Sequence, residues 1–250
     1  MRGFMISKYR DISIIDFGDK LLTIACDSCG GVGLLDGDIV KADGFNVGYH
    51  TAFVALAETL AIGAEPLMIV DTLSVSLESY GKSILYGIKS AAKEAGLDPS
   101  LSITGSSEEN FTVSSTGIGV TVLGQIDSPD FRPVPDGDKY EAVLFGIPYV
   151  GDEVLQNKAK VLSLESIKTI IGEASVLDLI PAGSRGVLFE TKQMAKDLGM
   201  EFSEESAIKD MIRQSAGPAT CAVAAVCPGS IESLKILIDI PVTLIGTFSK

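Results

Sequence analysis

Short apolar runs that stop at acidic residues mark the first half of the chain. Residues 21–26, LLTIAC, stop at Asp27, and residues 67–70, LMIV, stop at Asp71. Runs of this length bounded by polar residues predict buried strands, each ending at its aspartate. Residues 49–62 between them are apolar nearly all round, which predicts a buried helix.

Helical spacing returns after the second run. Residues 80–95 carry apolar side chains three or four positions apart, and Gly96 follows as a helix cap. A Gly-Ser loop, GSSEENF at residues 105–111, comes next. Residues 116–124, TGIGVTVLG, then alternate as a half-buried strand does. We therefore expect a sheet with helices on one face in this half.

The pattern restarts after a Pro- and Asp-rich segment at residues 128–138, SPDFRPVPDGD. A run of such turn-forming residues predicts a domain boundary, giving domains 1–130 and 131–250. In the second domain we predict strands within EAVLFGIP, CAVAAVC and PVTLIG, and helices near residues 164–172, 186–198, 204–214 and 230–238. Strands alternating with helices in both halves indicate an α+β chain of two domains.

Composition narrows the class of protein. Hydrophobic residues make up 46% of the chain and charged residues 21%, which is typical of globular proteins. No apolar run reaches the roughly 18 residues that a membrane span needs, and the N-terminus reads as a cytoplasmic start without a signal peptide. The net charge of -13 disfavours nucleic acid and anionic membranes as partners. The expected partner is a small molecule.

The cysteines carry little functional signal. Cys26 and Cys29 have the spacing of a redox or zinc motif, but Gly30 and Gly31 follow at once and the chain has one histidine. A zinc site would lack ligands. We interpret both residues as part of a buried strand and its loop.

Carboxylates form the constellation that suggests chemistry. Asp27 and Asp71 follow the two apolar runs, and Glu58 lies inside the apolar helix, where an isolated charge is costly. Glu108-Glu109-Asn110 sits in the Gly-Ser loop. Oxygen ligands of this kind suit Mg²⁺, which takes one or two carboxylates together with phosphate oxygens. The alternative is that these are solvated acids at strand ends.

At this point the sequence resembles a family. AETLAIGAEPL at residues 57–67, followed by a strand and Asp71, resembles the signature of the aminoimidazole-ribonucleotide synthetase (PurM-like) superfamily. Glu58 stands where that family has aspartate. TGSSEEN resembles the family's Gly-Gly acidic loop, with Glu109 keeping an acid and Ser106 replacing one. Residues 176–190 resemble a Gly-rich turn that opens a helix in the family's C-terminal α/β domain.

Within that superfamily the chain is most similar to the small α-ribazole kinase group of cobalamin salvage. The shared motifs are Arg10-Asp11-Ile12, Asp27-Ser28-x-Gly30-Gly31, Val47-Gly48, Asp71-Thr72-Leu73 and the loop from Gly105 to Asn110. The resemblance implies transfer of the γ-phosphoryl group of ATP to the ribose 5′-hydroxyl of α-ribazole. A different PurM-like synthetase or kinase, such as one like thiamine-monophosphate kinase, and a non-catalytic nucleotide-binding scaffold are the alternatives.

The resemblance also implies roles for single residues. Asp27, Glu58 and Asp71 are expected to hold Mg²⁺, and Glu109 and Asp27 to act in catalysis. Arg2, Lys8 and Arg10 either close over phosphates or are solvated charges of an N-terminal tail. The family implies a homodimer in which first domains pair strands. The residues expected to bind ATP are Gly105, Ser106, Asn110, His50, Gly30, Gly31 and Arg185.

Overall fold

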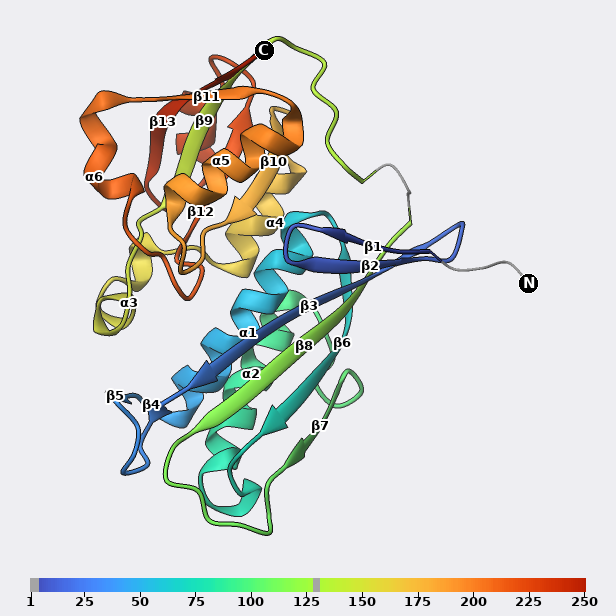
Figure 1. Ribbon diagram of the computed structural model, residues 1–250, viewed down its shortest axis with the longest axis vertical. Coiled ribbons are helices and arrows are strands. Elements are labelled where there is room, and N and C mark those ends of the chain that lie inside the picture. Colours follow the sequence, from blue (N-terminus) through green and yellow to red (C-terminus); the bar gives the residue numbers. More distant parts are fainter. Residues whose placement is uncertain (1–4, 128–130) are drawn as a thin grey trace. The chain divides into compact units, whose positions relative to one another are not determined.

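The computed structural model describes residues 5–127 and 131–250, and the chain forms two compact units, Met1–Pro129 and Asp130–Lys250 (Figure 1). Residues 128–130, which begin the segment predicted as a boundary, lie outside the described residues. Each unit has its own sheet and its own helices, so each buries a core of its own.

The first unit is built on a six-stranded sheet. Neighbouring strands are antiparallel except β6 and β7, which run parallel. Along β8, half-buried and buried residues alternate without a break, because successive side chains of a strand point to opposite faces. In spatial order the strands are β1 (Met5–Tyr9), β2 (Ile12–Asp16), β3 (Leu21–Gly30), β8 (Gly117–Ile126), β6 (Glu65–Leu73) and β7 (Ile103–Ser107).

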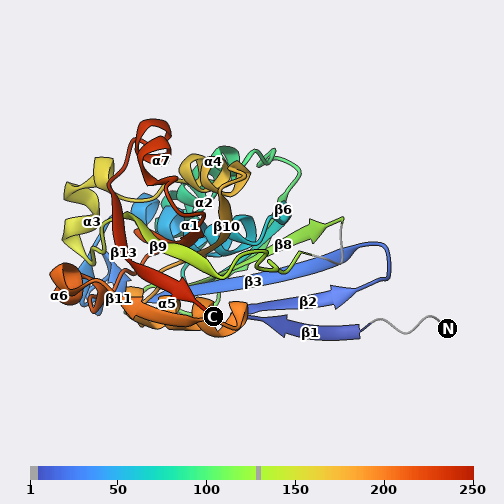
Figure 2. The ribbon, with the colours of Figure 1, turned by 90° about the horizontal axis from the view of Figure 1, so that it is seen from above.

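Helices α1 (Gly44–Ala61) and α2 (Lys82–Ala95) cover the buried face of this sheet. A Cβ on Gly124 of β8 would lie 2.7 Å from the Thr59 side chain of α1, so α1 packs directly on the strands. Figure 2 shows both helices on the same side of β1, β2 and β3. The π-helical turn η1 (Leu77–Gly81) leads into α2, and the short strands β4 (Val32–Gly33) and β5 (Val40–Lys41) pair in parallel beyond β3.

Two glycines let α1 and α2 approach closely. A Cβ on Gly48 would overlap the carbonyl oxygen of Ile84, and a Cβ on Gly87 would overlap that of Phe45. Any larger side chain at either position has to push the helices apart. The helix pair is therefore held at backbone contact distance.

The second unit contains a five-stranded antiparallel sheet. Every residue of β12 is buried, and Met194 and Leu198 of α5 belong to the same core cluster as Val223 and Phe248. The strands, in spatial order, are β10 (Val176–Pro181), β12 (Cys221–Val226), β9 (Lys139–Gly146), β13 (Val242–Ser249) and β11 (Glu201–Glu204). The helical elements are α3 (Asp152–Gln156), η2 (Lys158–Lys160), α4 (Leu164–Gly172), α5 (Val187–Leu198), η3 (Ser206–Ile208), α6 (Lys209–Ile212) and α7 (Ile231–Leu237).

Elements with local end signals match the sequence predictions. The helix predicted at 164–172 has those bounds, and α2 ends before Gly96, whose φ of 93° is left-handed. The buried helix before Gly63 is also confirmed, although it begins at Gly44 because Asp43 caps it by accepting a hydrogen bond from the Asn46 amide. The mixed α and β character of the chain is confirmed.

Several predicted boundaries are wrong. β3 runs on to Gly30 and β6 to Leu73, so Asp27 and Asp71 lie within strands and do not end them. The reason is that β8 supplies backbone partners beyond both aspartates. The Gly-rich turn expected within 176–190 does open a helix, α5, although strand β10 occupies residues 176–181 before it. Only 206–212 of the predicted helix 204–214 are helical. None of the helices within 5–127 and 131–250 is long and apolar enough to cross a bilayer.

Candidate functional site

Four residues on four adjacent strands form one row across the first sheet. Asp27 of β3 pairs with Val120 of β8, Val120 pairs with Asp71 of β6, and Asp71 pairs with Gly105 of β7. Residues directly opposite each other share a face of the sheet, and Val120 is buried beneath the helices. Asp27 and Asp71 therefore both face the helix layer, with Cα atoms about 10 Å apart across two strand spacings.

The Asp71 carboxylate occupies space that only glycine at position 105 leaves open. A Cβ on Gly105 would overlap the Asp71 carboxyl carbon and Oδ2, so the carboxylate leans over β7. Asp71 is only 4% exposed. Burial raises the pKa of this carboxyl, although its own backbone N–H and the Lys89 ammonium act in the opposite direction. A cation or a proton on Asp71 would relieve the cost of burying this charge.

A pocket of about 300 Å³ opens beside that carboxylate, bordered by β6, β7, α2 and the loop between α2 and β7. This volume is at the lower end for small-molecule sites. One part of the lining is apolar and the rest carries hydroxyls, a carboxylate and an ammonium, which suits a ligand of mixed character. The lining residues are Asp71, Leu73, Leu77, Leu85, Lys89, Pro99, Ser100, Ile103, Thr104, Gly105, Ser106 and Ser107.

Asp27 lies two strands away from this pocket. Burial raises the pKa of its carboxyl to about 6, with a smaller opposing effect from the Ser28 backbone N–H. Cys29, two residues on and on the same face, interacts with Thr51 of α1, and burial raises the pKa of its thiol. Asp27 is thus a carboxylate beneath α1 that is easily protonated just below neutral pH.

The two predicted residues of α1 do not line the pocket. Glu58 is half-buried near the C-terminal end of the helix. His50 lies eight residues earlier, about 12 Å away along the helix axis, with its ring edge-on to Tyr49 at 5.2 Å. The structure therefore brings Asp71, Gly105 and Ser106 together, and leaves Glu58 and His50 apart from them.

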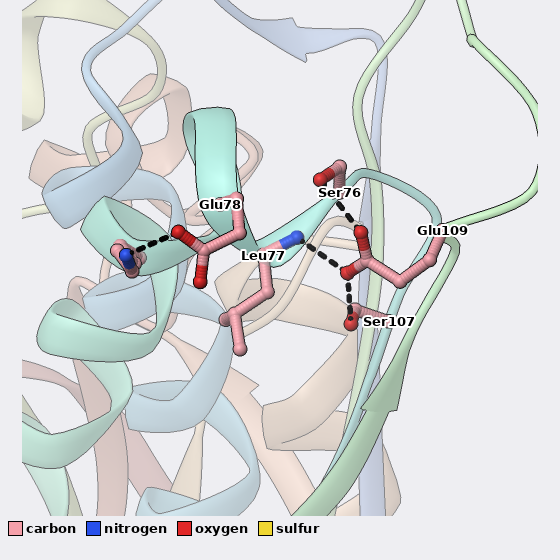
Figure 3. Close-up of polar contacts among 6 residues, drawn as sticks. Ser76, Leu77, Glu78, Ser107 and Glu109 are labelled. Carbon is pink, nitrogen blue, oxygen red and sulfur yellow. Dashed lines mark hydrogen bonds and ion pairs between the residues drawn. The ribbon is translucent and has the colours of Figure 1, made fainter.

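Glu109 is held by hydrogen bonds at the start of η1 (Figure 3). Its Oε1 accepts from the Leu77 amide at 2.8 Å and from the Ser107 hydroxyl at 2.7 Å, and its Oε2 accepts from the Ser76 hydroxyl at 2.7 Å. These donors, the Leu77 amide foremost, hold the pKa of Glu109 below its usual range. A carboxylate stabilised in this way is a weak proton acceptor.

The rest of that acidic loop is also internally bonded. Glu108 Oε1 accepts hydrogen bonds from the backbone amides of Asn110 and Phe111, at 2.6 and 3.2 Å. The Asn110 side chain is exposed and does not line the pocket. Glu108 therefore shapes the loop, and Asn110 reaches a ligand only if that ligand extends beyond the pocket.

Asp38 organises the far end of β3 and is a residue that the sequence analysis missed. Its carboxylate accepts hydrogen bonds from the Leu35 amide, the Thr116 amide and hydroxyl, and the Ser115 hydroxyl, at 2.6 to 3.0 Å. Burial favours a higher pKa, but these bonds outweigh it and lower the pKa of Asp38. A carboxylate flanked by Gly37 in a turn-rich segment was the available signal.

The predicted glycines Gly30 and Gly31 lie at this same end of the sheet. Gly31 donates its amide to the Thr116 carbonyl at 2.9 Å, and its carbonyl accepts from the Ile39 and Val40 amides. Its φ of 71° favours glycine. Both glycines lie outside the pocket lining and serve the turn that Asp38 fixes.

The remaining basic candidates lie elsewhere. Arg185 belongs to the second unit, where its guanidinium stacks 4.1 Å from the Phe189 ring and lies 3.9 Å from Glu190. Lys8 is in strand β1 and not in a tail, and Arg10 lies over the Tyr9 ring at 4.6 Å. Arg2 lies outside the described residues.

The carboxylates fit magnesium only as a partner of phosphate. Within residues 5–127 and 131–250, no three His, Cys, Asp or Glu side chains are grouped so as to hold a metal ion. Mg²⁺ is usually bound by one or two carboxylates plus substrate phosphates and water. Asp71 beside a pocket meets that requirement, whereas a cage made of protein ligands alone does not exist among the described residues.

Residues 9–125 match the family described as AIR synthase related protein, N-terminal domain. This stretch runs from the end of β1 almost to the end of β8 and contains the whole row from Asp27 to Gly105. None of the curated proteins matches the sequence.

Solved structures match over most of the chain. "AaThiL complexed with AMPPCP and TMP" has a TM-score of 0.66 and 14% identity, covering 96% of this chain and 84% of that one. Thiamine-monophosphate kinase from Stenotrophomonas maltophilia K279a has a TM-score of 0.64 and 15% identity, covering 100% and 89%. A HypE–HypF complex has a TM-score of 0.63 and 14% identity, covering 94% and 86%. Identities this low establish a shared fold alone.

Proposed function

We propose that this chain is an ATP- and magnesium-dependent phosphotransferase that phosphorylates the ribose 5′-hydroxyl of α-ribazole. The observation that carries the phosphotransferase assignment is the buried Asp71 carboxylate, which leans over Gly105 beside a hydroxyl-lined pocket. Such a carboxylate needs a cation, and a phosphate-bound Mg²⁺ supplies one. The matched domain family and the neighbour bound to AMPPCP support the same kind of ligand.

The α-ribazole acceptor rests on sequence motifs. Asp27-Ser28 with Gly30-Gly31, Asp71-Thr72-Leu73, and the loop from Gly105 to Asn110 resemble the α-ribazole kinase group. In the fold, the first two motifs lie on β3 and β6 and the third begins on β7. One residue of each motif, Asp27, Asp71 and Gly105, belongs to the row across the sheet.

In the proposed site Asp71 holds Mg²⁺ on the nucleotide, together with phosphate oxygens and water. Asp27 lies two strands away and Glu58 lies apart from the pocket on α1, so the three expected ligands do not form one group. When bound, Mg²⁺ neutralises the charge of the phosphate oxygens during transfer. Gly105 and Ser106 bring the backbone of β7 close to the nucleotide. These residues position the donor, which is the main task in phosphoryl transfer.

Between the two carboxylates proposed to act in catalysis, Asp27 is better suited to accept the hydroxyl proton. Its pKa of about 6 is close to neutral, whereas hydrogen bonds lower the pKa of Glu109. A proton acceptor works best when its pKa lies near the working pH. Glu109 instead fixes the loop against η1.

A kinase like thiamine-monophosphate kinase is the second candidate. Two of the structural neighbours, one complexed with AMPPCP and TMP, favour it. That acceptor already carries a phosphate, whereas α-ribazole is a nucleoside without one. The acceptor's charge is therefore the property that separates the two candidates.

ADP release measured with each acceptor tests the proposal. We expect magnesium-dependent ADP formation with α-ribazole and a 5′-phosphorylated product by mass spectrometry, and near-complete loss in Asp71→Asn. Release with thiamine monophosphate alone would move the assignment to the second candidate. Release with neither, together with nucleotide binding by calorimetry, would leave a non-catalytic scaffold.

We also propose that the chain forms a homodimer through its first unit. Met5 and Ile6 of the edge strand β1 are 65% and 66% exposed, and a free edge strand with apolar side chains is a ready surface for pairing. Light scattering should give twice the mass of the chain. The double substitution of Met5 and Ile6 by lysine should give the monomer mass.

A further inference from the structure

Lys89 is a cation at the pocket that the proposed function does not use. It lies one helical turn after Leu85 on α2, and residues four apart share a helix face, so both line the pocket. Asp71 lines the same pocket from β6. Its side chain is exposed, which puts the ammonium at the mouth of the pocket.

The ammonium of Lys89 has no ion-pair or hydrogen-bond partner in the part of the chain that the structure describes. Lys82, two turns earlier on the same helix, pairs with Glu78 at 2.6 Å. The protein carries 33 acidic residues against 20 basic ones, so acids to pair with are plentiful. An unpaired ammonium here leaves a positive site in an otherwise acidic protein.

The pocket lining also contains four hydroxyl side chains. The Ser100 hydroxyl donates a hydrogen bond to Asp98, and the Ser107 hydroxyl donates one to Glu109, each at 2.7 Å. The hydroxyls of Thr104 and Ser106 make no hydrogen bond within residues 5–127 and 131–250. Thr104 and Ser106 alternate with Gly105 along β7, so their side chains point to the face of the sheet away from Asp71. The positive group that the pocket presents to a ligand is therefore the ammonium of Lys89.

Neutralising Asp71 does not account for Lys89. The two side chains form no ion pair. A lysine placed to satisfy Asp71 would be in contact with it.

We propose that Lys89 binds a phosphate group of the ligand held in this pocket, as a positively charged contact additional to the metal. This rests on the proposed function and narrows it: the ligand carries its phosphate toward α2, opposite the carboxylates. An ammonium is a compact point charge with three donors, well suited to phosphate oxygens. The phosphate belongs either to the nucleotide or to a phosphorylated acceptor.

Calorimetric titration of the full chain with Mg²⁺ present tests this with three probes: ADP, adenosine and thiamine monophosphate. Lys89→Gln is compared with the matched control Lys93→Gln, which removes the same charge from an exposed position in the last turn of α2 outside the pocket. We expect Lys89→Gln to weaken ADP binding about tenfold, the value of a charged hydrogen bond, and to leave adenosine within twofold. Lys93→Gln should leave both unchanged.

The other outcomes are equally distinct. If Lys89→Gln weakens the binding of thiamine monophosphate and not that of ADP, the proposal is still supported, and the bound phosphate belongs to the acceptor. If Lys89→Gln weakens the binding of ADP and adenosine equally, or if the two variants do not differ, the role of Lys89 is overturned. ADP binding by the native protein would still uphold the nucleotide site in that case. A native protein that binds none of the three probes overturns both. Unchanged thermal melting of both variants excludes misfolding.

Discussion

Asp27 is a charge that the folded first unit tolerates poorly. Burial raises its pKa from an ordinary value of 3.8 to about 6 in the folded protein. Between pH 4 and 6 the folded state holds a proton that the unfolded state releases, so the free energy of unfolding falls as pH rises. Above pH 6 the destabilisation is complete.

We therefore expect Asp27→Asn to raise the free energy of unfolding at pH 7.5 by about 1–2 kcal/mol, a value reduced for partial solvation. At pH 3 the gain should vanish, because both states then carry a largely neutral side chain. Denaturant titration at the two pH values measures it, with the exposed Asp36→Asn as control. A variant less stable than the native protein at pH 7.5 would show that the carboxylate is stabilising in the fold.

Glu109 is the opposite case to Asp27, because the folded protein lowers its pKa. Its lowered pKa means that its three hydrogen bonds favour the ionised form, so they weaken as pH falls through that lowered value. We expect Glu109→Gln to reduce kcat by less than tenfold and to speed hydrogen exchange of the Leu77 amide. A general base is worth 10²–10⁴-fold. A loss of roughly that size in kcat would return the proton-accepting role to Glu109.

At the scale of elements, the close contact of α1 and α2 depends on single glycines. A Cβ on Gly87 would overlap backbone atoms of Phe45 and Tyr49, and neither helix can yield without moving off the sheet. We expect Gly87→Ala to destabilise the protein by about 1–3 kcal/mol, as overpacking does. Gly172→Ala, at a helical position with no atom within 4 Å of the new Cβ, should be neutral or stabilising. Thermal melts of both variants measure this, and equal stability would contradict the close packing.

Strand ends show where sequence reasoning stops. The pattern ended β3 at Cys26 because the next residues are polar, yet Asp27 to Gly30 pair with Val120 to Gly117 of β8. Strand pairing joins residues that are far apart in the sequence, so the local pattern of apolar and polar residues cannot predict where the pairing ends. Helix ends were better predicted because Gly96 and Ser163 act locally, through a left-handed cap and a capping box.

The candidate site divides in the same way. Asp71, Gly105 and Ser106 were predicted from motifs, and the parallel register of β6 and β7 brings them together. Lys89 and Asp38 were missed because their positions depend on tertiary packing. Lys89 reaches the pocket because α2 borders it, and Asp38 acts by binding Thr116, which is far away in the sequence. Neither residue stands in a motif of its own.

At the scale of the whole molecule, the net charge of -13 opposes any polyphosphate ligand. We expect EDTA to weaken binding of a non-hydrolysable ATP analogue about 100-fold, since a coordinated cation supplies several kcal/mol of charge stabilisation. NaCl at matched ionic strength should not restore the affinity, because screening shortens the range of repulsion without coordinating phosphate to Asp71. Equilibrium dialysis at both conditions measures it. Full restoration by NaCl would reduce magnesium to a screening ion, and the buried carboxylate would then have to be neutralised by a proton instead.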